Sequence, residues 1–309
     1  MGIFKKRNNK NRFNDDLPCP ELSGDGRNLL NDFYKEKTDN EKSKEQTVEQ
    51  QEKKDNLDLD LCYFLGKTPN GLKQEFYQFQ VDELMAKIGL SLLDGEKDKK
   101  TLIDKVEECK EYGSKEVLFT PFYLPIIKQV VKKTSAKTLK LITATDYPLG
   151  QSGIKSKVNS VKESIKQGSN KVGISLTCSA VDFSLLGEEK RKTEKAIKAS
   201  KGQGGVIVEG IYDHQSIIKT LKAIDGIKFS RIYIKLEKSD FISPLELVSK
   251  IKQACPKKSL CIISNAKTIS DLSVLTSGQC DLIFTPYANV IGQSLYKTFN
   301  LTPKNTLQT

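Results

Sequence analysis

Eight short apolar runs, each set apart from the next by a lysine-rich amphipathic stretch, constrain most strongly what this chain can fold into. The stretches between the runs have helical periodicity, and several end in glycine, as helices commonly do. Strands that alternate with helices form right-handed βαβ units and a parallel sheet. The runs lie at residues 88–93, 116–122, 139–148, 171–177, 205–211, 231–236, 259–264 and 281–286.

Eight such units predict an α/β fold, a closed (β/α)8 TIM barrel over residues 84–300, because barrels of this kind need roughly 200 to over 400 residues. A doubly wound open sheet is the alternative. That fold normally carries a glycine-rich loop after its first strand, and the stretch DGEKDKK at residues 94–100 is not one. In a barrel, the residues that bind and react lie at the C-terminal ends of the strands.

Residues 1–80 have a different composition, dominated by Asn, Lys, Glu, Asp and Gln. Such a segment cannot bury enough apolar surface to offset its ordering entropy, so we expect a disordered N-terminal tail. Its first dozen residues, MGIFKKRNNKNR, carry no acid. They could act as a recognition arm for an acidic protein partner or a lipid surface, or simply be solvated. Residues 301–309 form a short C-terminal tail.

The net charge of +11 comes from lysines spread along the amphipathic stretches, with little Arg and no aromatic interleaving. We therefore do not expect nucleic-acid binding, whereas a phosphorylated small molecule would suit a basic protein. The seven cysteines are dispersed without CxxC spacing, and His214 is the single histidine, so we expect neither a metal nor another cofactor. Dispersed thiols and the lack of a run of about 20 apolar residues indicate a cytoplasmic protein with free cysteines and no transmembrane segment.

The ends of several runs resemble the deoxyribose-phosphate aldolase family of class I aldolases. Tyr147-Pro148-Leu149-Gly150 resembles the Phe-Pro-Leu-Gly that ends the family's third strand, and VIVEGIY resembles its fifth strand through Glu209 and Tyr212. TPFYLP at 120–125 and GLSLLD at 89–94 resemble the ends of its second and first strands. The similarity runs in order over about residues 88–295.

The resemblance implies a TIM barrel in which a lysine at the end of strand six attacks an aldehyde and forms a Schiff base. That position is Lys235, which could equally be an ordinary strand-end lysine. The family also uses a second lysine to lower the pKa of the first, and an aspartate to move protons. By the resemblance, the family's strand-seven lysine matches one of the residues from Cys261 to Ile263, and its strand-four aspartate matches Gly173. Its strand-five lysine matches Gly205 and its strand-one aspartate matches Gly89, and glycine can supply neither charge nor proton transfer.

The family's phosphate grip follows strands six to eight, and here the matching loops contain no glycine. Lys238 and Lys267 could supply positive charge near Lys235, and hydroxyls and one carboxylate at the strand ends could contact substrate. These candidate substrate-binding residues are Ser91, Thr120, Glu209, Ser239, Ser264 and Thr285.

Three hypotheses follow. The chain is a divergent deoxyribose-phosphate aldolase-like barrel that is weak or inactive as an aldolase, and thus a pseudoenzyme. Alternatively, it is an active Schiff-base lyase on a phosphorylated sugar. In the third, it is a non-catalytic binding protein or scaffold that recognises a partner through its basic surface or its N-terminal tail.

Overall fold

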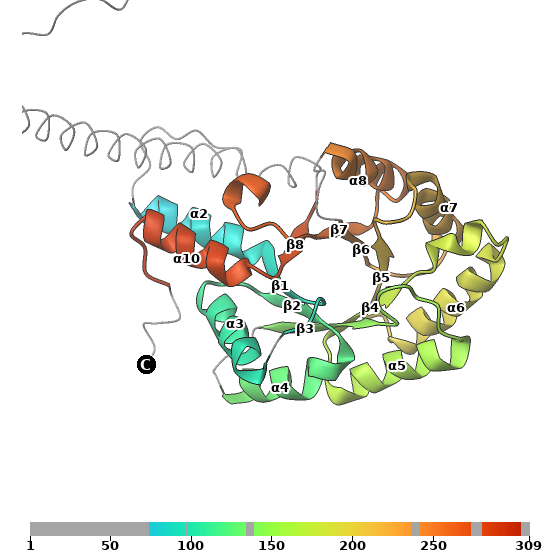
Figure 1. The fold of residues 1–309 in the computed structure, drawn as a ribbon, viewed down its shortest axis with the longest axis horizontal. Coiled ribbons are helices and arrows are strands. Elements are labelled where there is room, and N and C mark those ends of the chain that lie inside the picture. Colours follow the sequence, from blue (N-terminus) through green and yellow to red (C-terminus); the bar gives the residue numbers. More distant parts are fainter. Residues whose placement is uncertain (1–73, 97, 134–138, 237–241, 273–279, 304–309) are drawn as a thin grey trace, which may run out of the picture. The chain divides into compact units, whose positions relative to one another are not determined.

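A computed structural model describes residues 74–303 except 97, 134–138, 237–241 and 273–279. Eight parallel strands close into a barrel in the order β1 to β8, which confirms the predicted (β/α)8 fold (Figure 1). The strands are β1 Ile88–Leu92, β2 Glu116–Phe119, β3 Lys140–Thr145, β4 Lys171–Ser175, β5 Gly204–Glu209, β6 Arg231–Lys235, β7 Ser259–Ile263 and β8 Leu282–Thr285.

Helices surround the barrel, as Figure 1 shows. Local sequence sets their ends: Asp98 and Asp213 accept hydrogen bonds from backbone N–H groups at the starts of α3 and α7, and Gly168 ends α5 in the left-handed region. The helices are α2 Gln74–Ala86, α3 Lys99–Glu111, α4 Leu124–Lys133, α5 Ile154–Gln167, α6 Leu186–Ala199, α7 His214–Ile224, α8 Ile242–Ala254 and α10 Ala288–Thr298, with 3-10 turns at η1 Pro121–Tyr123 and η2 Cys178–Val181.

Helix α2 corrects one predicted boundary. It begins at Gln74, so residues 74–80 belong to the fold and not to an unstructured tail. The reason is packing: Tyr77 stacks on Phe299 with ring centroids 4.7 Å apart, and Val81 is fully buried. The prediction of disorder for residues 1–73, like that of a tail at 304–309, lies outside the described residues.

The strands separate two apolar layers, because neighbouring residues on a strand point to opposite faces. On β6, Ile232 and Ile234 pack against the surrounding helices, whereas Tyr233 packs inside the barrel. The alternation places Arg231 and Lys235 on the same inward face as Tyr233. The interior is filled by Leu93, Leu118, Ile142, Ala144, Ile207, Tyr233, Cys261, Ile263 and Phe284.

An ion cluster closes the N-terminal end of the barrel. The buried carboxylate of Glu116 on β2 accepts a hydrogen bond from the Arg231 guanidinium and another from Lys171 Nζ at 3.2 Å. Burial opposes the charged form of Glu116, but the hydrogen bonds and charges of Arg231 and Lys171 outweigh it and lower the pKa of this carboxyl. These ion pairs link β2, β4 and β6 at the N-terminal end of the barrel, next to the apolar interior.

Cys109, Cys178, Cys255, Cys261 and Cys280 are free thiols, as predicted, while Cys19 and Cys62 lie outside the described residues. Among the helices that the structure describes, none combines the length and the apolar character needed to cross a bilayer.

Candidate active site

Lys235 lies at the C-terminal mouth of the barrel, where β6 ends. Its amine donates a hydrogen bond of 2.6 Å to Asp94 Oδ1, just beyond β1, and one of 3.1 Å to the Tyr147 hydroxyl, just beyond β3. The Lys235 side chain is 13% exposed. Glu209, a residue proposed from the sequence for substrate binding, is buried at the end of β5 and pairs in register with Lys235.

These contacts control the protonation of Lys235. Burial alone would lower the pKa of its amine, but the hydrogen bonds to Asp94 and Tyr147 prevail and raise that pKa above the ordinary 10.5. Burial, with a contribution from the charge of Glu209, also raises the pKa of Tyr147, so the phenol stays neutral. At neutral pH the mouth therefore holds an ammonium ion, the opposite of what Schiff-base formation requires.

Asp94 and Tyr147 lie in motifs that carried the family resemblance, but they were not among the site residues that the sequence reasoning selected. Both are polar residues two positions beyond the last residue of a strand, which is a signal that could have found them. What the sequence does not show is that the closure of the barrel brings them to one amine: Asp94 and Lys235 are 141 residues apart.

Gly89, Gly173 and Gly205, which the sequence resemblance matched to catalytic positions, are packed against neighbouring residues. A Cβ at Gly89 would lie 2.4 Å from the Phe284 ring, and one at Gly173 would lie 2.7 Å from Ile207 Cδ1. A Cβ at Gly205 would lie 2.8 Å from the Arg231 carbonyl oxygen and 2.9 Å from the Tyr233 ring. These contacts are shorter than packed atoms allow, so a side chain at any of the three positions would require its neighbours to shift.

The remaining candidates from the sequence are not gathered around Lys235 by any contact in the described structure. The Thr285 hydroxyl donates to the Ala266 carbonyl at 2.6 Å, Ser264 Oγ accepts from the Ala266 N–H at 3.4 Å, and the Lys267 amine lies 5.0 Å from the Tyr287 ring centroid. Ser91 is buried on β1, and Thr120 precedes η1 without capping it through its side chain. Lys238 and Ser239 lie outside the described residues.

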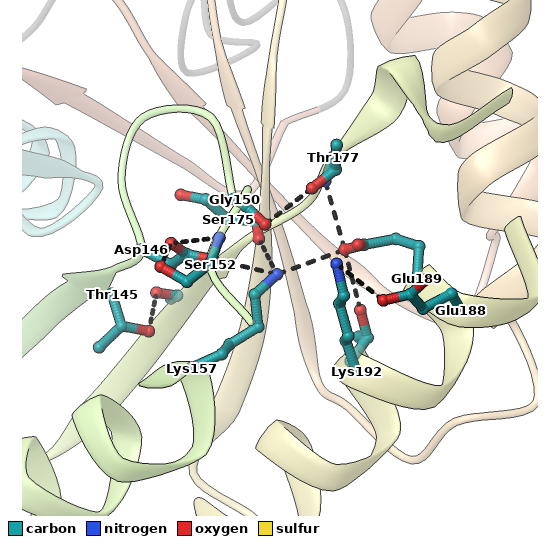
Figure 2. Close-up of polar contacts among 12 residues, drawn as sticks. Thr145, Asp146, Gly150, Ser152, Lys157, Ser175, Thr177, Glu188, Glu189 and Lys192 are labelled. Carbon is teal, nitrogen blue, oxygen red and sulfur yellow. Dashed lines mark hydrogen bonds and ion pairs between the residues drawn. The ribbon is translucent and has the colours of Figure 1, made fainter. Parts of the chain in front are cut away.

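A second polar cluster, which the sequence did not reveal, lies beside the mouth between the ends of β3 and β4 and the starts of α5 and α6 (Figure 2). Its centre is Lys157 on α5, a fully buried lysine within 3.3 Å of both Asp146 Oδ2 and Glu189 Oε1. In a chain with 50 Lys and Arg residues, no sequence pattern distinguishes this lysine from the solvated ones. Among the described residues, no group of three or more His, Cys, Asp or Glu side chains could hold a metal ion.

Comparison with known proteins gives a consistent result. No family model matches the chain. A deoxyribose-phosphate aldolase from Dictyoglomus turgidum is 30% identical over 149 residues, covering 46% of this chain and 61% of that protein. One from Mycoplasmoides pirum is 33% identical over 132 residues, covering 39% of this chain and 58% of that protein. The chain thus matches less than two thirds of the length of these relatives.

Among solved structures, the tetrameric deoxyribose phosphate aldolase from Aeropyrum pernix superposes with a TM-score of 0.60 at 18% identity, covering 76% of this chain and 96% of that one. QR15, an aldolase, gives 0.61 at 16% identity, covering 70% and 96%. At such identities these structures establish the fold. The molecule is therefore a (β/α)8 barrel. Over less than half of its length, its sequence is similar to deoxyribose-phosphate aldolases.

Proposed function

We propose that this barrel is a pseudoenzyme-like relative of deoxyribose-phosphate aldolase, with weak or no retro-aldol activity on 2-deoxyribose 5-phosphate. The residue at position 173 carries this proposal. The resemblance matches Gly173 to the family's proton-transferring aspartate, but glycine has no side chain to move a proton, and general acid–base catalysis is worth roughly 10²–10⁴-fold. The hydrogen bonds from Lys235 to Asp94 and Tyr147 support the proposal further, because they stabilise the ammonium form and an ammonium ion cannot attack a carbonyl.

A coupled assay for acetaldehyde release from 2-deoxyribose 5-phosphate tests the proposal, with the Dictyoglomus turgidum aldolase as the positive control. We expect turnover far below the ~10 s⁻¹ typical of enzymes. Turnover near that value would support the alternative, an active Schiff-base lyase on a phosphorylated sugar. In that case, borohydride trapping with acetaldehyde should mark Lys235 ahead of the surface lysines, and Lys235→Met should abolish both the mark and the turnover.

A second candidate function, binding of an acidic protein, rests on the charge of one side of the barrel. Residues 154–254, which include α5 to α8, contain 19 Lys and Arg against 11 Asp and Glu. Residues 81–153, which include α3 and α4, contain 12 against 11. Counted over the helices alone, α5 to α8 contain 13 Lys and Arg against 5 Asp and Glu, and α3 and α4 contain 7 against 4. The helices α5 to α8 therefore carry more of the excess positive charge.

Two grooves between these helices are lined by both lysines and apolar side chains. The α7–α8 groove, about 560 Å³, has Lys219, Lys222 and Lys250 around Ile218 and Ala254. The α5–α6 groove, about 570 Å³, is lined by Ile154, Lys155, Val158, Asn159, Lys162, Lys195, Lys198 and Ala199. Such grooves fit an acidic amphipathic protein segment better than a nucleic acid, because neither Phe, Tyr or Trp for base stacking nor an arginine lines either groove.

A pair of synthetic peptides tests this candidate. One is a glutamate-rich helix with a leucine face, and the other has the same composition with the face scrambled. We expect the first to bind more tightly, and Lys219→Glu/Lys222→Glu/Lys250→Glu to weaken it. The matched triple variant Lys99→Glu/Lys100→Glu/Lys132→Glu, on α3 and α4, should bind normally. Equal binding of the two peptides, or tighter binding of an RNA oligonucleotide, would contradict the candidate.

A further inference from the structure

The β3–α5 turn, residues 146–153, connects the buried lysine to the lysine at the mouth. Removing a lysine ammonium from water costs several kcal/mol, even in proteins that relax around it, unless the charge is compensated. Lys157 is compensated on three sides: its Nζ donates to the Ser175 carbonyl at 2.9 Å and lies 3.3 Å from each of two carboxylate oxygens, Glu189 Oε1 and Asp146 Oδ2. It therefore joins the ends of β3 and β4 to the helices α5 and α6.

The cluster holds the first residue of this turn in an unusual conformation. Asp146 has a φ of 59°, in the left-handed region that disfavours side chains other than those of Gly, Asn and Asp. Its carboxylate binds Lys157 and also accepts hydrogen bonds from the hydroxyl and the N–H of Ser152 (Figure 2). The same side chain thus closes the turn on itself and joins it to the buried lysine.

The cluster also holds the turn at Gly150. The Thr177 hydroxyl donates to the Gly150 carbonyl at 2.7 Å, and the Thr177 N–H donates to Glu189 Oε1 at 3.2 Å (Figure 2). A Cβ at Gly150 would lie 2.4 Å from the Ser175 carbonyl oxygen, so the turn packs directly on the end of β4. Lys157 is therefore connected to Gly150 through Glu189 and Thr177.

Tyr147 lies in the turn between Asp146 and Gly150, the two residues that the cluster holds. Its hydroxyl accepts a hydrogen bond from Lys235. We infer that the Lys157 cluster positions Tyr147, and that Tyr147 and Asp94 together hold Lys235 as an unreactive ammonium ion. Lys157 is thus a positioning residue for the mouth lysine. This inference rests on the proposed function, since it explains how a barrel that retains the lysine keeps it from reacting.

The Lys235 amine should become more reactive when its hydrogen bond to Tyr147 or Asp94 is lost. If Tyr147 and Asp94 no longer stabilise the ammonium, burial remains and lowers the pKa of Lys235. The free amine can then add to an aldehyde and lose water to give an imine, which a hydride donor reduces to a stable secondary amine. A fall of one pKa unit raises the free-amine fraction at neutral pH about tenfold.

The experiment measures trapping of acetaldehyde on Lys235 with cyanoborohydride as a function of pH, relative to exposed Lys155, by peptide mass mapping of the full chain. We expect Tyr147→Phe to raise Lys235 labelling at pH 7.5 by up to about tenfold and to move its pH midpoint down. Lys157→Met should act in the same direction. The double variant should label no more than Tyr147→Phe, because Lys157 acts through Tyr147.

Two milder variants protect the test against simple unfolding. Thr177→Val keeps the side-chain shape but removes the bond to Gly150, and should raise Lys235 labelling. Ser200→Ala is the control: the buried Ser200 hydroxyl donates to the Ile197 carbonyl at 2.7 Å at the end of α6, away from the turn, and its loss should leave labelling unchanged. The inference is overturned if both Lys157→Met and Thr177→Val leave the Lys235 pH profile as in the original protein, or if the effects of Lys157→Met and Tyr147→Phe add. Turnover of 2-deoxyribose 5-phosphate by the unaltered protein would refute the proposed function separately.

Discussion

The two ends of β6 present the same arrangement with opposite consequences. Arg231 and Lys235 both face the interior of the barrel, and each binds a carboxylate from an earlier part of the sequence. At the N-terminal end the Glu116 side chain is only 6% exposed, whereas at the mouth the Asp94 side chain is 57% exposed. A pair buried on both sides cannot exchange a lost partner for water, but a pair with one side in solvent can. The Arg231–Glu116 pair therefore stabilises the fold, whereas the Lys235–Asp94 pair mainly holds the Lys235 amine in its protonated form.

The largest effect should come from breaking the buried pair. Glu116→Ala removes the carboxylate and leaves Arg231 and Lys171 without their shared partner. Removing one member of a buried ion pair typically costs about 3–5 kcal/mol. We expect the free energy of unfolding, measured by urea denaturation, to fall toward that range. A loss of unfolding free energy below about 1 kcal/mol would show that the pair at the N-terminal end contributes no more to stability than an exposed ion pair.

The next effect concerns the filled interior between the two ends. Gly173→Asp places a Cβ 2.7 Å from Ile207 Cδ1. Overpacking of this kind typically costs about 1–3 kcal/mol, and the added carboxylate has no room to act. We expect lower stability in urea and no gain of aldolase turnover. Adding Ile207→Ala should recover part of the loss by making space, and a Gly173→Asp variant as stable as the unaltered protein would refute the packing argument.

The fold could be predicted from the sequence because its signals are local. Each strand and helix is marked by the periodicity of its own residues, and the order of eight pairs then leaves few topologies. The match of Gly89, Gly173 and Gly205 to catalytic positions of the aldolase family stays a prediction from the resemblance, and the sequence did not show that Phe284, Ile207 and Tyr233 pack against these glycines.

The arrangement around Lys235 could not be predicted in the same way, because it depends on contacts between distant residues. The position of Lys235 follows from the register of one strand, whereas its protonation depends on Asp94 and Tyr147. Burial alone would lower the pKa of the Lys235 amine, yet the hydrogen bonds to Asp94 and Tyr147 raise it. Likewise, only the packing of α5 against the end of β4 separates buried Lys157 from exposed Lys155 two residues earlier.

Acid should weaken the ion pair at the N-terminal end of the barrel. The folded-state pKa of Glu116 lies below its ordinary value of 4.5. Its ion pair therefore stabilises the fold fully above that value, and the contribution is lost as the pH falls through the lower, folded-state pKa. We expect the unfolding free energy of the unaltered protein to drop below about pH 4.5 more steeply than that of Glu116→Gln. Parallel curves for the two proteins would contradict this assignment.

The smallest effect on stability, and the sharpest test of the two ends, should come from Asp94→Ala. Exposed ion pairs contribute about 0–1 kcal/mol, so the unfolding free energy should change by less than about 1 kcal/mol. Lys235 has a raised pKa, so its pair with Asp94 persists at neutral pH and is lost only above about pH 10.5. Removing Asp94 should lower that pKa and increase acetaldehyde trapping on Lys235 at pH 7.5, while labelling of exposed Lys155 stays constant. Unchanged trapping together with a loss of several kcal/mol would show that the mouth pair, like the one at the N-terminal end, is structural.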